Sequence, residues 1–289
     1  MSQPEKQSYQ AIVIGSGQGG TPLAVKLASR GMSTALIEAR HVGGTCVNYG
    51  CTPTKTMVAS ARTAHVATRA SDYGVSVTAT VTELRTVRER KRQIVDMFRS
   101  GSERHIEQTA NLDLVRGTAS FAGERRLRVR ADGAERELTA EKIFINTGTR
   151  PAVPPICGLE GVPFLDNESI MELDAVPDHL LVLGGGYVGL EFGQMFRRFG
   201  SRVTVIQRGA QLLPREDADI ASEIAEILRE DGLEVLLNST AEEAGKEGEE
   251  ILLVVRSDGE PRTVRGSHVL VATGRTPKTQ DLDLSAAGV

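Results

Sequence analysis

Two cysteines in the segment GGTCVNYGCTPTKT (43–56) have the residue type and spacing for redox chemistry. Cys46 and Cys51 are separated by four residues. The following Thr52-Pro53 predicts a helix N-cap and first helical residue, which places Cys51 just outside a helix N-terminus. The helix dipole stabilises a thiolate there. A disulfide that closes so short a loop is typically labile and catalytic, so we expect a dithiol that exchanges two electrons.

Two other interpretations of this pair remain open. Zinc would need two further ligands, and the sequence offers no second paired motif, so no metal site is predicted. Two buried, inert thiols would leave the neighbouring glycines and Lys55 unexplained. The third cysteine, Cys157, stands alone in a Pro-rich stretch, and we expect it to be structural.

The elements that must position the pair follow a pattern that occurs twice in the chain. An apolar run leads into Gly15-x-Gly17-x-x-Gly20, and a second one leads into the same spacing of Gly184, Gly186 and Gly189. The remaining segments of the two copies are helical stretches (23–31 and 190–200), β-rich runs (34–38 and 202–207), and apolar strands ending in Thr-Gly (143–148 and 269–274). Strand, glycine turn, helix and strand form a βαβ unit, which predicts a parallel sheet.

Alternating segments around Asp-Gly pairs, 126–140 and 251–266, predict antiparallel hairpins laid on each sheet. The fold class is therefore α/β, with two tandem Rossmann-like doubly wound domains, each with a parallel sheet and a small antiparallel β-meander. The first copy carries extra residues, which hold the cysteine pair and two expected helices near 53–70 and 82–108. The Pro-rich stretch 150–158 marks the boundary between copies.

Each glycine motif is suited to a dinucleotide. The first glycine permits the tight turn, the second lets a pyrophosphate approach the backbone, and the third lets helix and strand pack. Glu38 occupies the position that binds a ribose diol in the first copy, and Gln207 occupies it in the second. Because Arg208 follows and attracts a 2′-phosphate, the second copy favours NADPH over NADH. A packing turn in either copy, and a surface role for Arg208, remain the alternatives.

Composition limits the class of protein. The chain has 289 residues, of which 40% are hydrophobic and 25% charged, as in a globular protein of about two domains. A net charge of −4, and the glutamates Glu83 and Glu89 mixed with the basic run 85–92, argue against a nucleic-acid partner. No apolar run approaches about 18 residues, so no membrane span is expected. The polar start MSQPEKQSYQ lacks a secretory signal, which predicts a cytoplasmic protein.

Over essentially its whole length, the chain resembles the class I pyridine nucleotide–disulfide oxidoreductases. The residues that carry the resemblance are the segment GGTCVNYGCTPTK, the doubled glycine motifs and the two Thr-Gly closures. That family includes mercuric reductase and dihydrolipoamide dehydrogenase. The resemblance implies that Cys51 is the charge-transfer thiol against the flavin and Cys46 the interchange thiol that meets substrate. It implies that Lys55 lies beside the reactive edge of the flavin with Glu191 as its ion-pair partner, and that Tyr187 gates access of the nicotinamide.

The resemblance also implies the cofactor-binding residues. For FAD these are Gly15, Gly17, Gly20, Glu38, Gly44, Thr45, Lys55, Ala119, Thr147 and Gly148. For NADPH or NADH they are Gly184, Gly186, Tyr187, Gly189, Glu191, Gln207, Arg208, Thr240, Gly274 and Arg275. The corresponding domains are an FAD-binding domain (1–150), an NAD(P)H-binding domain (151–280) and a segment returning toward the FAD domain (281–289).

The function implied is an FAD-dependent NAD(P)H:disulfide oxidoreductase that serves a small-molecule or metal-ion acceptor. The stretch VTVIQR, followed by LLPREDADI, is similar to mercuric reductase, and dihydrolipoyl dehydrogenase or another small-disulfide reductase is the alternative. Relatives continue into a dimerisation domain with a catalytic His-Glu pair, which is absent before Val289, so a homodimer is expected only of a full-length relative. A nucleotide-binding module without turnover is the rival from another class. Lys278, where the family usually has Asn, has no assigned meaning.

Overall fold

The computed structural model describes residues 6–257 and 259–289, which group into two compact units. The first unit comprises the described residues up to Thr52 together with Gln93–Arg150 and Pro277–Val289, and the second comprises Pro53–Arg92 and Pro151–Thr276. Most of the polar start of the chain, residues 1–5, and the Asp of the second Asp-Gly pair, residue 258, lie outside the described residues. The domains predicted from the sequence, which are defined by cofactor, remain a prediction.

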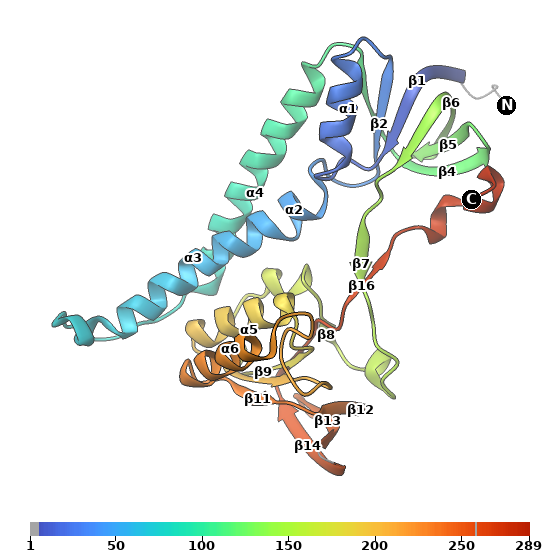
Figure 1. Ribbon diagram of the computed structural model, residues 1–289. Coiled ribbons are helices and arrows are strands. Elements are labelled where there is room, and N and C mark those ends of the chain that lie inside the picture. Colours follow the sequence, from blue (N-terminus) through green and yellow to red (C-terminus); the bar gives the residue numbers. More distant parts are fainter. Residues whose placement is uncertain (1–5, 258) are drawn as a thin grey trace. The chain divides into compact units, whose positions relative to one another are not determined.

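The first unit is built on a six-stranded mixed sheet in the order β3-β2-β1-β6-β5-β4. Strands β1 (Lys6–Ile14), β2 (Thr34–Glu38), β3 (Leu112–Arg116) and β6 (Ala134–Ile145) are parallel, with Ile12 paired to both Ala35 and Ile143. Strands β4 (Thr118–Gly123) and β5 (Arg126–Ala131) continue the sheet as an antiparallel meander. Helix α1 (Gly20–Ala28) connects β1 and β2, as Figure 1 shows.

The second unit has a five-stranded parallel sheet in the order β11-β10-β9-β15-β8. Its strands are β8 (Phe164–Leu165), β9 (His179–Leu183), β10 (Arg202–Ile206), β11 (Glu234–Leu236) and β15 (His268–Val271). Helices α5 (Tyr187–Phe199) and α6 (Ala218–Glu230) connect successive strands. A separate antiparallel sheet contains β12 (Ser239–Glu247), β13 (Glu250–Ser257) and β14 (Glu260–Gly266). The predicted α/β fold class is confirmed.

The two meanders differ in a way that the sequence did not predict. Both hairpins were expected to lie on their sheets, but in the first unit the single long strand β6 pairs with β1 and with β5, so the meander and the parallel strands form one sheet. In the second unit β14 ends at Gly266, before β15 begins. A Cβ on Gly266 would lie 2.6 Å from the Leu181 side chain, so the backbone there passes too close to β9 for a larger residue.

The extra stretch of the first copy forms a helical hairpin. Helices α3 (Cys51–Thr68) and α4 (Leu84–Glu107) confirm the helices expected near 53–70 and 82–108, with a 3₁₀ turn at Ala70–Tyr73 between them. One helix was missed, the short α2 (Gly44–Asn48). One expectation was wrong by a residue or two: Cys51 is the first residue of α3 rather than a residue outside it.

The Pro53–Arg92 part of this hairpin belongs to the second unit and packs there through its apolar side chains. Met57, Ala61 and Leu84 are buried in the core that also contains Phe192 and Phe196 of α5. The core of the first unit is separate and contains Ile12, Ile37, Leu127 and Leu138 as large, fully buried side chains. Each unit therefore buries its own apolar surface, which is the main stabilising contribution to either.

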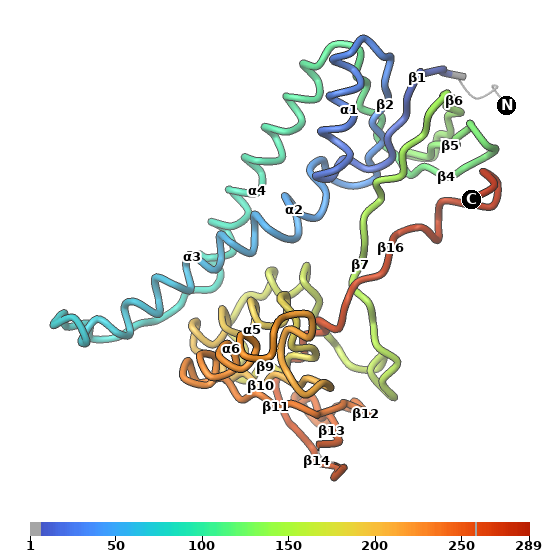
Figure 2. The backbone as a smooth tube through the Cα atoms, viewed as in Figure 1, coloured from blue at the N-terminus to red at the C-terminus, as the bar shows by residue number. Residues whose placement is uncertain are grey.

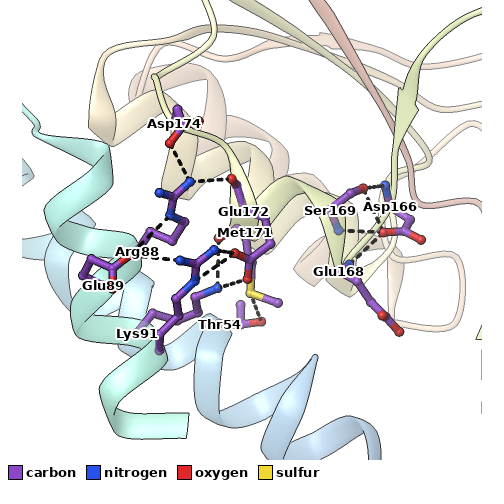
Figure 3. Close-up of polar contacts among 11 residues, drawn as sticks. Thr54, Arg88, Glu89, Lys91, Asp166, Glu168, Ser169, Met171, Glu172 and Asp174 are labelled. Carbon is purple, nitrogen blue, oxygen red and sulfur yellow. Dashed lines mark hydrogen bonds and ion pairs between the residues drawn. The ribbon is translucent and has the colours of Figure 1, made fainter. Parts of the chain in front are cut away.

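Charged groups of α4 hold the 3₁₀ turn at Ser169–Glu172, as Figure 3 shows. Lys91 is only 3% exposed, and its ammonium donates to the Met171 carbonyl at 3.0 Å and pairs with Glu172. Arg88 donates to the Glu172 carbonyl at 2.9 Å and to Asp174 at 2.6 Å. The basic run of the sequence is therefore engaged with acidic and carbonyl groups of the same unit.

The chain enters and leaves the Pro151–Thr276 part of the second unit along two strands that pair with each other, β7 (Thr149–Pro151) and β16 (Arg275–Pro277). Figure 2 shows the two segments running alongside one another. Beyond β16, the chain returns to the first unit through short 3₁₀ turns at Gln280–Leu282 and Leu284–Ala287, and Leu282 is buried in the core of that unit. A further 3₁₀ turn, Leu159–Gly161, lies in the second unit. Within the described ranges, no helix combines the length and apolarity needed to cross a membrane.

Candidate functional site

The glycine loop of the first unit combines two packing glycines with one open glycine. Gly15 has φ +102°, and a Cβ there would lie 2.3 Å from the Asn146 carbonyl oxygen. A Cβ on Gly20 would lie 1.8 Å from the Gly15 carbonyl oxygen. A Cβ on Gly17 would find its nearest neighbour at 3.8 Å, an ordinary contact, so this backbone is accessible. The first and third glycines close the turn, and the second leaves space for a ligand.

The glycine loop of the second unit repeats this division. Gly184 has φ +107°, and its Cβ would lie 2.5 Å from the Ala272 carbonyl oxygen. The Cβ of Gly189 would lie 2.1 Å from the Gly184 carbonyl oxygen, whereas a Cβ on Gly186 would meet nothing within 4 Å. Gly186 directly precedes Tyr187, the first residue of α5, so the open backbone adjoins a helix N-terminus. Both loops fit a pyrophosphate, which needs close approach to backbone N–H groups at a helix N-terminus.

Glu38, at the end of β2, lies against the first glycine loop. One oxygen of its carboxylate accepts hydrogen bonds from the Ser16 backbone N–H at 3.0 Å and from the Ser16 hydroxyl at 2.6 Å. The other oxygen accepts one from the Arg40 N–H at 2.8 Å. The carboxylate is thereby fixed beside the loop, and the oxygen that accepts only from Arg40 keeps further acceptor capacity for a ribose diol.

Gln207, at the equivalent position after β10, uses its amide within the protein. Its side-chain oxygen accepts from the Gly185 N–H at 3.1 Å, and its NH₂ donates to the Gln211 carbonyl at 3.1 Å. The side chain is buried and holds the glycine loop to the segment that follows the strand. Because Gln207 is neutral, it does not repel a phosphate on the ribose.

A cavity of about 930 Å³ in the second unit collects most residues predicted to bind the nicotinamide nucleotide. It is lined by Gly184, Gly186, Tyr187, Gln207, Arg208, Thr240, Gly274 and Arg275, while Gly189 packs beneath the loop. The cavity volume lies in the range of ligand sites. Arg215 also lines the cavity, and sequence reasoning missed it although it follows Arg208 closely in the same loop.

Tyr187 projects from the start of α5 and is 64% exposed. Its hydroxyl donates a hydrogen bond to the Glu216 carboxylate, and this bond raises the pKa of Tyr187. Glu216, a second residue that the sequence did not single out, directly follows the cavity-lining Arg215. The structure thus places the predicted gating tyrosine at the cavity mouth, where it is hydrogen-bonded to the loop that carries two arginines.

Lys55 of α3 and Glu191 of α5 form an ion pair, as the family resemblance implied. Both residues belong to the second unit. They line a smaller cavity of about 410 Å³, together with Tyr187 and the apolar side chains of Leu190 and Leu228. The lysine side chain remains 69% exposed, so its charge is available to a group outside the pair.

The two cysteines of the predicted redox pair are in hydrogen-bond contact. Cys46, on α2, is half-buried, and Cys51, at the start of α3, is exposed. The two sulfurs are not bonded to each other in the structure, and their assignment as a redox pair stays a prediction. Burial and then the hydrogen bond with Cys51 raise the pKa of Cys46 to about 11.

The remaining residues predicted to bind FAD lie in the first unit. Gly44 has φ +60°, and its Cβ would lie 2.5 Å from the Gly17 Cα, so the segment before the cysteines touches the glycine loop. Thr45 is the second residue of α2, Ala119 is buried in β4, and Thr147-Gly148 follows β6. Asn146, which the sequence did not single out, packs against the loop, because its side-chain oxygen would lie 2.7 Å from a Cβ on Gly19.

Among the residues for which coordinates are described, no group of three or more His, Cys, Asp or Glu side chains could hold a metal ion. The zinc interpretation of the cysteine pair therefore finds no additional ligands there. What the geometry provides is two loops suited to dinucleotides, a dithiol and a cation held by a carboxylate.

Comparisons with known proteins agree with this arrangement. Residues 9–289 match the family described as "Pyridine nucleotide-disulphide oxidoreductase", and the chain belongs to that family. It is 38% identical over 284 residues to the probable pyridine nucleotide-disulfide oxidoreductase RclA of Escherichia coli K12, an alignment that covers 97% of this chain and 60% of the relative. It is 37% identical to the mercuric reductase of Streptomyces lividans, in an alignment that covers 97% of this chain and 60% of that relative. It is 32% identical to the dihydrolipoyl dehydrogenase of Bacillus subtilis, in an alignment that covers 96% of this chain and 60% of that relative.

Among solved structures, the Cu(II) complex of the HOCl-induced flavoprotein disulfide reductase RclA from Escherichia coli superposes with a TM-score of 0.86 at 37% identity. That alignment covers 98% of this chain and 60% of the other. The chain thus spans about 60% of the length of these relatives. The family membership of the chain follows from these matches.

Proposed function

We propose that this chain carries the FAD and NADPH sites and the redox-active cysteine pair of an NADPH:disulfide oxidoreductase. The observation that carries the proposal is the combination, in one chain, of two glycine loops with an open second glycine and of two thiols in hydrogen-bond contact. When bound, a flavin supplies a two-electron carrier between a nicotinamide and a disulfide. The net reaction converts NADPH, a proton and the Cys46–Cys51 disulfide into NADP⁺ and two thiols.

The residues of the chain perform distinct tasks in this proposal. The carboxylate of Glu191 keeps the Lys55 ammonium in place, so that its positive charge favours negative charge that develops nearby. Cys46 transfers electrons to the acceptor through its sulfur, and it must first lose a proton, because burial keeps it protonated near neutral pH. Cys51 then completes the disulfide as electrons leave the pair.

For the nucleotide, the proposal is NADPH rather than NADH. Arg208 and Arg215 both line the cavity of the second unit. In the described part of the chain, neither guanidinium has a carboxylate within ion-pairing distance, so both charges are available to a 2′-phosphate. Gln207, where a ribose-binding acid would stand, adds no repulsion.

For the acceptor, we propose a thiophilic metal ion, with mercuric ion first, and a lipoyl or other small disulfide as the alternative. Mercuric reductases are among the relatives, and the RclA structure is a Cu(II) complex. Two thiolates suit such ions. Reduction of Hg(II) to Hg(0) takes the two electrons of one NADPH and returns the pair to the disulfide.

The full-length protein is proposed to be a cytoplasmic homodimer.

The test is anaerobic titration of flavin-loaded, oxidised protein with NADPH. One equivalent should generate two titratable thiols and a long-wavelength absorbance band that requires the Cys51 sulfur. Cys51→Ser should abolish the band, whereas Cys46→Ser should retain it, because Cys51 then has no disulfide partner. Cys157→Ser is the matched control and should change neither thiol release nor band.

A titration in which no thiols appear would contradict the proposal. Protein that takes up NADPH but retains no flavin would instead favour the rival interpretation, a nucleotide-binding module without turnover.

A further inference from the structure

Asn48 lies between the two cysteines in the sequence and is a buried polar residue, 7% exposed. Its side-chain NH₂ donates to the Val42 carbonyl and to the Gly44 carbonyl, both at 2.9 Å. Its side-chain oxygen accepts from the Arg99 Nε–H at 2.7 Å. Both ends of the amide are therefore engaged. Because Arg can only donate, the contact with Arg99 fixes which end of the amide faces the carbonyls.

The hydrogen bonds of Asn48 bind the two sides of a turn whose other contacts include the burial of Val42 and a hydrogen bond from the Gly43 N–H to the Ser16 carbonyl at 3.1 Å. Gly43 has φ +99° and Gly44 has φ +60°, and the turn touches Gly17 of the dinucleotide loop. Helix α2, which follows and carries Cys46, has only five residues. A helix of that length is not stable by itself, so its orientation depends on contacts made by its side chains. Asn48 supplies these contacts from the last residue of the helix.

Arg99 reaches this site from α4 and is itself held. Its Nη1 donates to Asp96 at 3.1 Å on the same helix, and its side chain is 24% exposed. Asn48, Arg99 and the two cysteines all belong to the first unit. A hydrogen-bonded path thus runs from a long, well-anchored helix to the turn immediately before Cys46.

We propose that Asn48, held by Arg99, is a positioning residue that sets how strongly the Cys46–Cys51 disulfide is favoured over the dithiol. The inference rests on the proposed function, since it concerns that redox pair. A disulfide forms only when both sulfurs are held at bonding distance, so an orientation of α2 that keeps them together raises their effective concentration. Without the amide, the turn and α2 sample more orientations, and the ordered disulfide loses stability relative to the dithiol.

The measurement is the equilibrium of the full chain with glutathione: the protein disulfide and two reduced glutathiones exchange with the dithiol and one oxidised glutathione. Acid quenching, alkylation and mass analysis count the thiols at Cys46 and Cys51. We expect Asn48→Ala and Arg99→Gln each to lower the effective concentration of the pair about tenfold or more, which corresponds to about 30 mV for this two-electron couple. Asn48→Asp retains an acceptor for Arg99 but loses both donors, so it should shift the equilibrium in the same direction.

Asn111→Ala is the matched control. It removes an asparagine amide from the same unit, at a position with φ +62°, away from the cysteines. It should lower the free energy of unfolding while leaving the glutathione equilibrium within twofold of the wild type. If Asn48→Ala fails to fold, Arg99→Gln carries the test, because it leaves all backbone contacts of α2 intact.

The outcomes separate the two proposals. A wild-type chain that forms no Cys46–Cys51 disulfide at any glutathione ratio would overturn the proposed function. A wild type that forms the disulfide, with Arg99→Gln and Asn48→Ala within twofold of it, would overturn the positioning role alone. An equal shift in Asn111→Ala would also overturn it, since general loss of stability would then account for the effect.

Discussion

The thiols of the redox pair have different surroundings although they share a hydrogen bond. Cys46 is partly withdrawn from solvent on a one-turn helix, while Cys51 is exposed at the start of a long one. Burial, which disfavours a thiolate, is the main reason that the pKa of Cys46 is raised. The sulfur assigned to substrate exchange is thus the one that is protected from adventitious reaction.

This protection predicts a pH dependence. In the reduced protein, alkylation of Cys46 by iodoacetamide should rise with a midpoint of about 11, because only the thiolate reacts. At pH 8 its rate should be about a hundredfold below that of an unperturbed thiol. Peptide mass analysis after timed alkylation measures it. A midpoint near or below the ordinary value would contradict the burial argument. In Cys51→Ser the midpoint should fall only in part, because burial remains.

The arginines of the nucleotide cavity predict a selective loss of affinity. Removing a charge-assisted hydrogen bond costs about 1.5–3 kcal/mol, so Arg208→Gln and Arg215→Gln should each weaken NADPH binding by about tenfold to a hundredfold. NADH binding should change by less than threefold. Isothermal titration calorimetry with both nucleotides measures the ratio. Arg256→Gln is the control, because Arg256 is paired with Glu242 on the meander. Equal losses for both nucleotides would rule out a 2′-phosphate site.

At the scale of an element, each glycine loop contains glycines that are required for close packing and a nearby glycine that leaves space for a ligand. Gly189 fixes the approach of α5 to the strand before it, whereas Gly186 leaves open space at the start of the same helix. The first unit has the same division between Gly20 and Gly17. The same βαβ geometry therefore occurs in both units, and the residues after the loop, Glu38 and Gln207, differ between them.

Two alanine substitutions in α5 and its loop should separate these roles. Gly189→Ala places a Cβ 2.1 Å from a backbone oxygen and should cost at least about 3 kcal/mol of stability, measured by urea unfolding. Gly186→Ala should leave stability within about 1 kcal/mol, because its Cβ meets nothing, yet weaken NADPH binding tenfold or more by occupying the phosphate cradle. If Gly186→Ala binds NADPH normally, the cradle is not where the pyrophosphate lies.

At the scale of the whole molecule, each unit buries its own clusters of apolar side chains, so the two units can differ in their free energies of unfolding. A ligand that binds one folded unit stabilises that unit by mass action, about 2.7 kcal/mol at a concentration of 100 Kd. In calorimetry, NADPH should therefore raise one unfolding transition and FAD the other. Arg208→Gln should reduce the NADPH shift at the same NADPH concentration while leaving the FAD shift unchanged. A single transition that both ligands raise equally would show that the units unfold together.

The sequence predicted what depends on local pattern. The repeated glycine spacing and the apolar runs defined both βαβ units, and strand Thr34–Glu38 was predicted to the residue. Patterns gave no indication of contacts made between distant segments. The pairing of β6 with two neighbours, the contact of Tyr187 with Glu216, and the amide of Asn48 each depend on tertiary geometry. Arg215 was missed for a different reason, because no periodicity distinguishes it from a surface arginine.

The paired strands β7 and β16 bring together the two points at which the chain enters and leaves the Pro151–Thr276 part of the second unit. Such adjacent ends usually mark an insertion that can be cut out and replaced by a short loop. Here a simple excision of 152–274 would leave Met57 and Ala61 without their apolar neighbours and Lys91 without Glu172. A folded fragment that contains only the first unit would therefore have to be made by removing Pro53–Arg92 of the α3–α4 hairpin as well, so the gene cannot be divided at one pair of junctions alone.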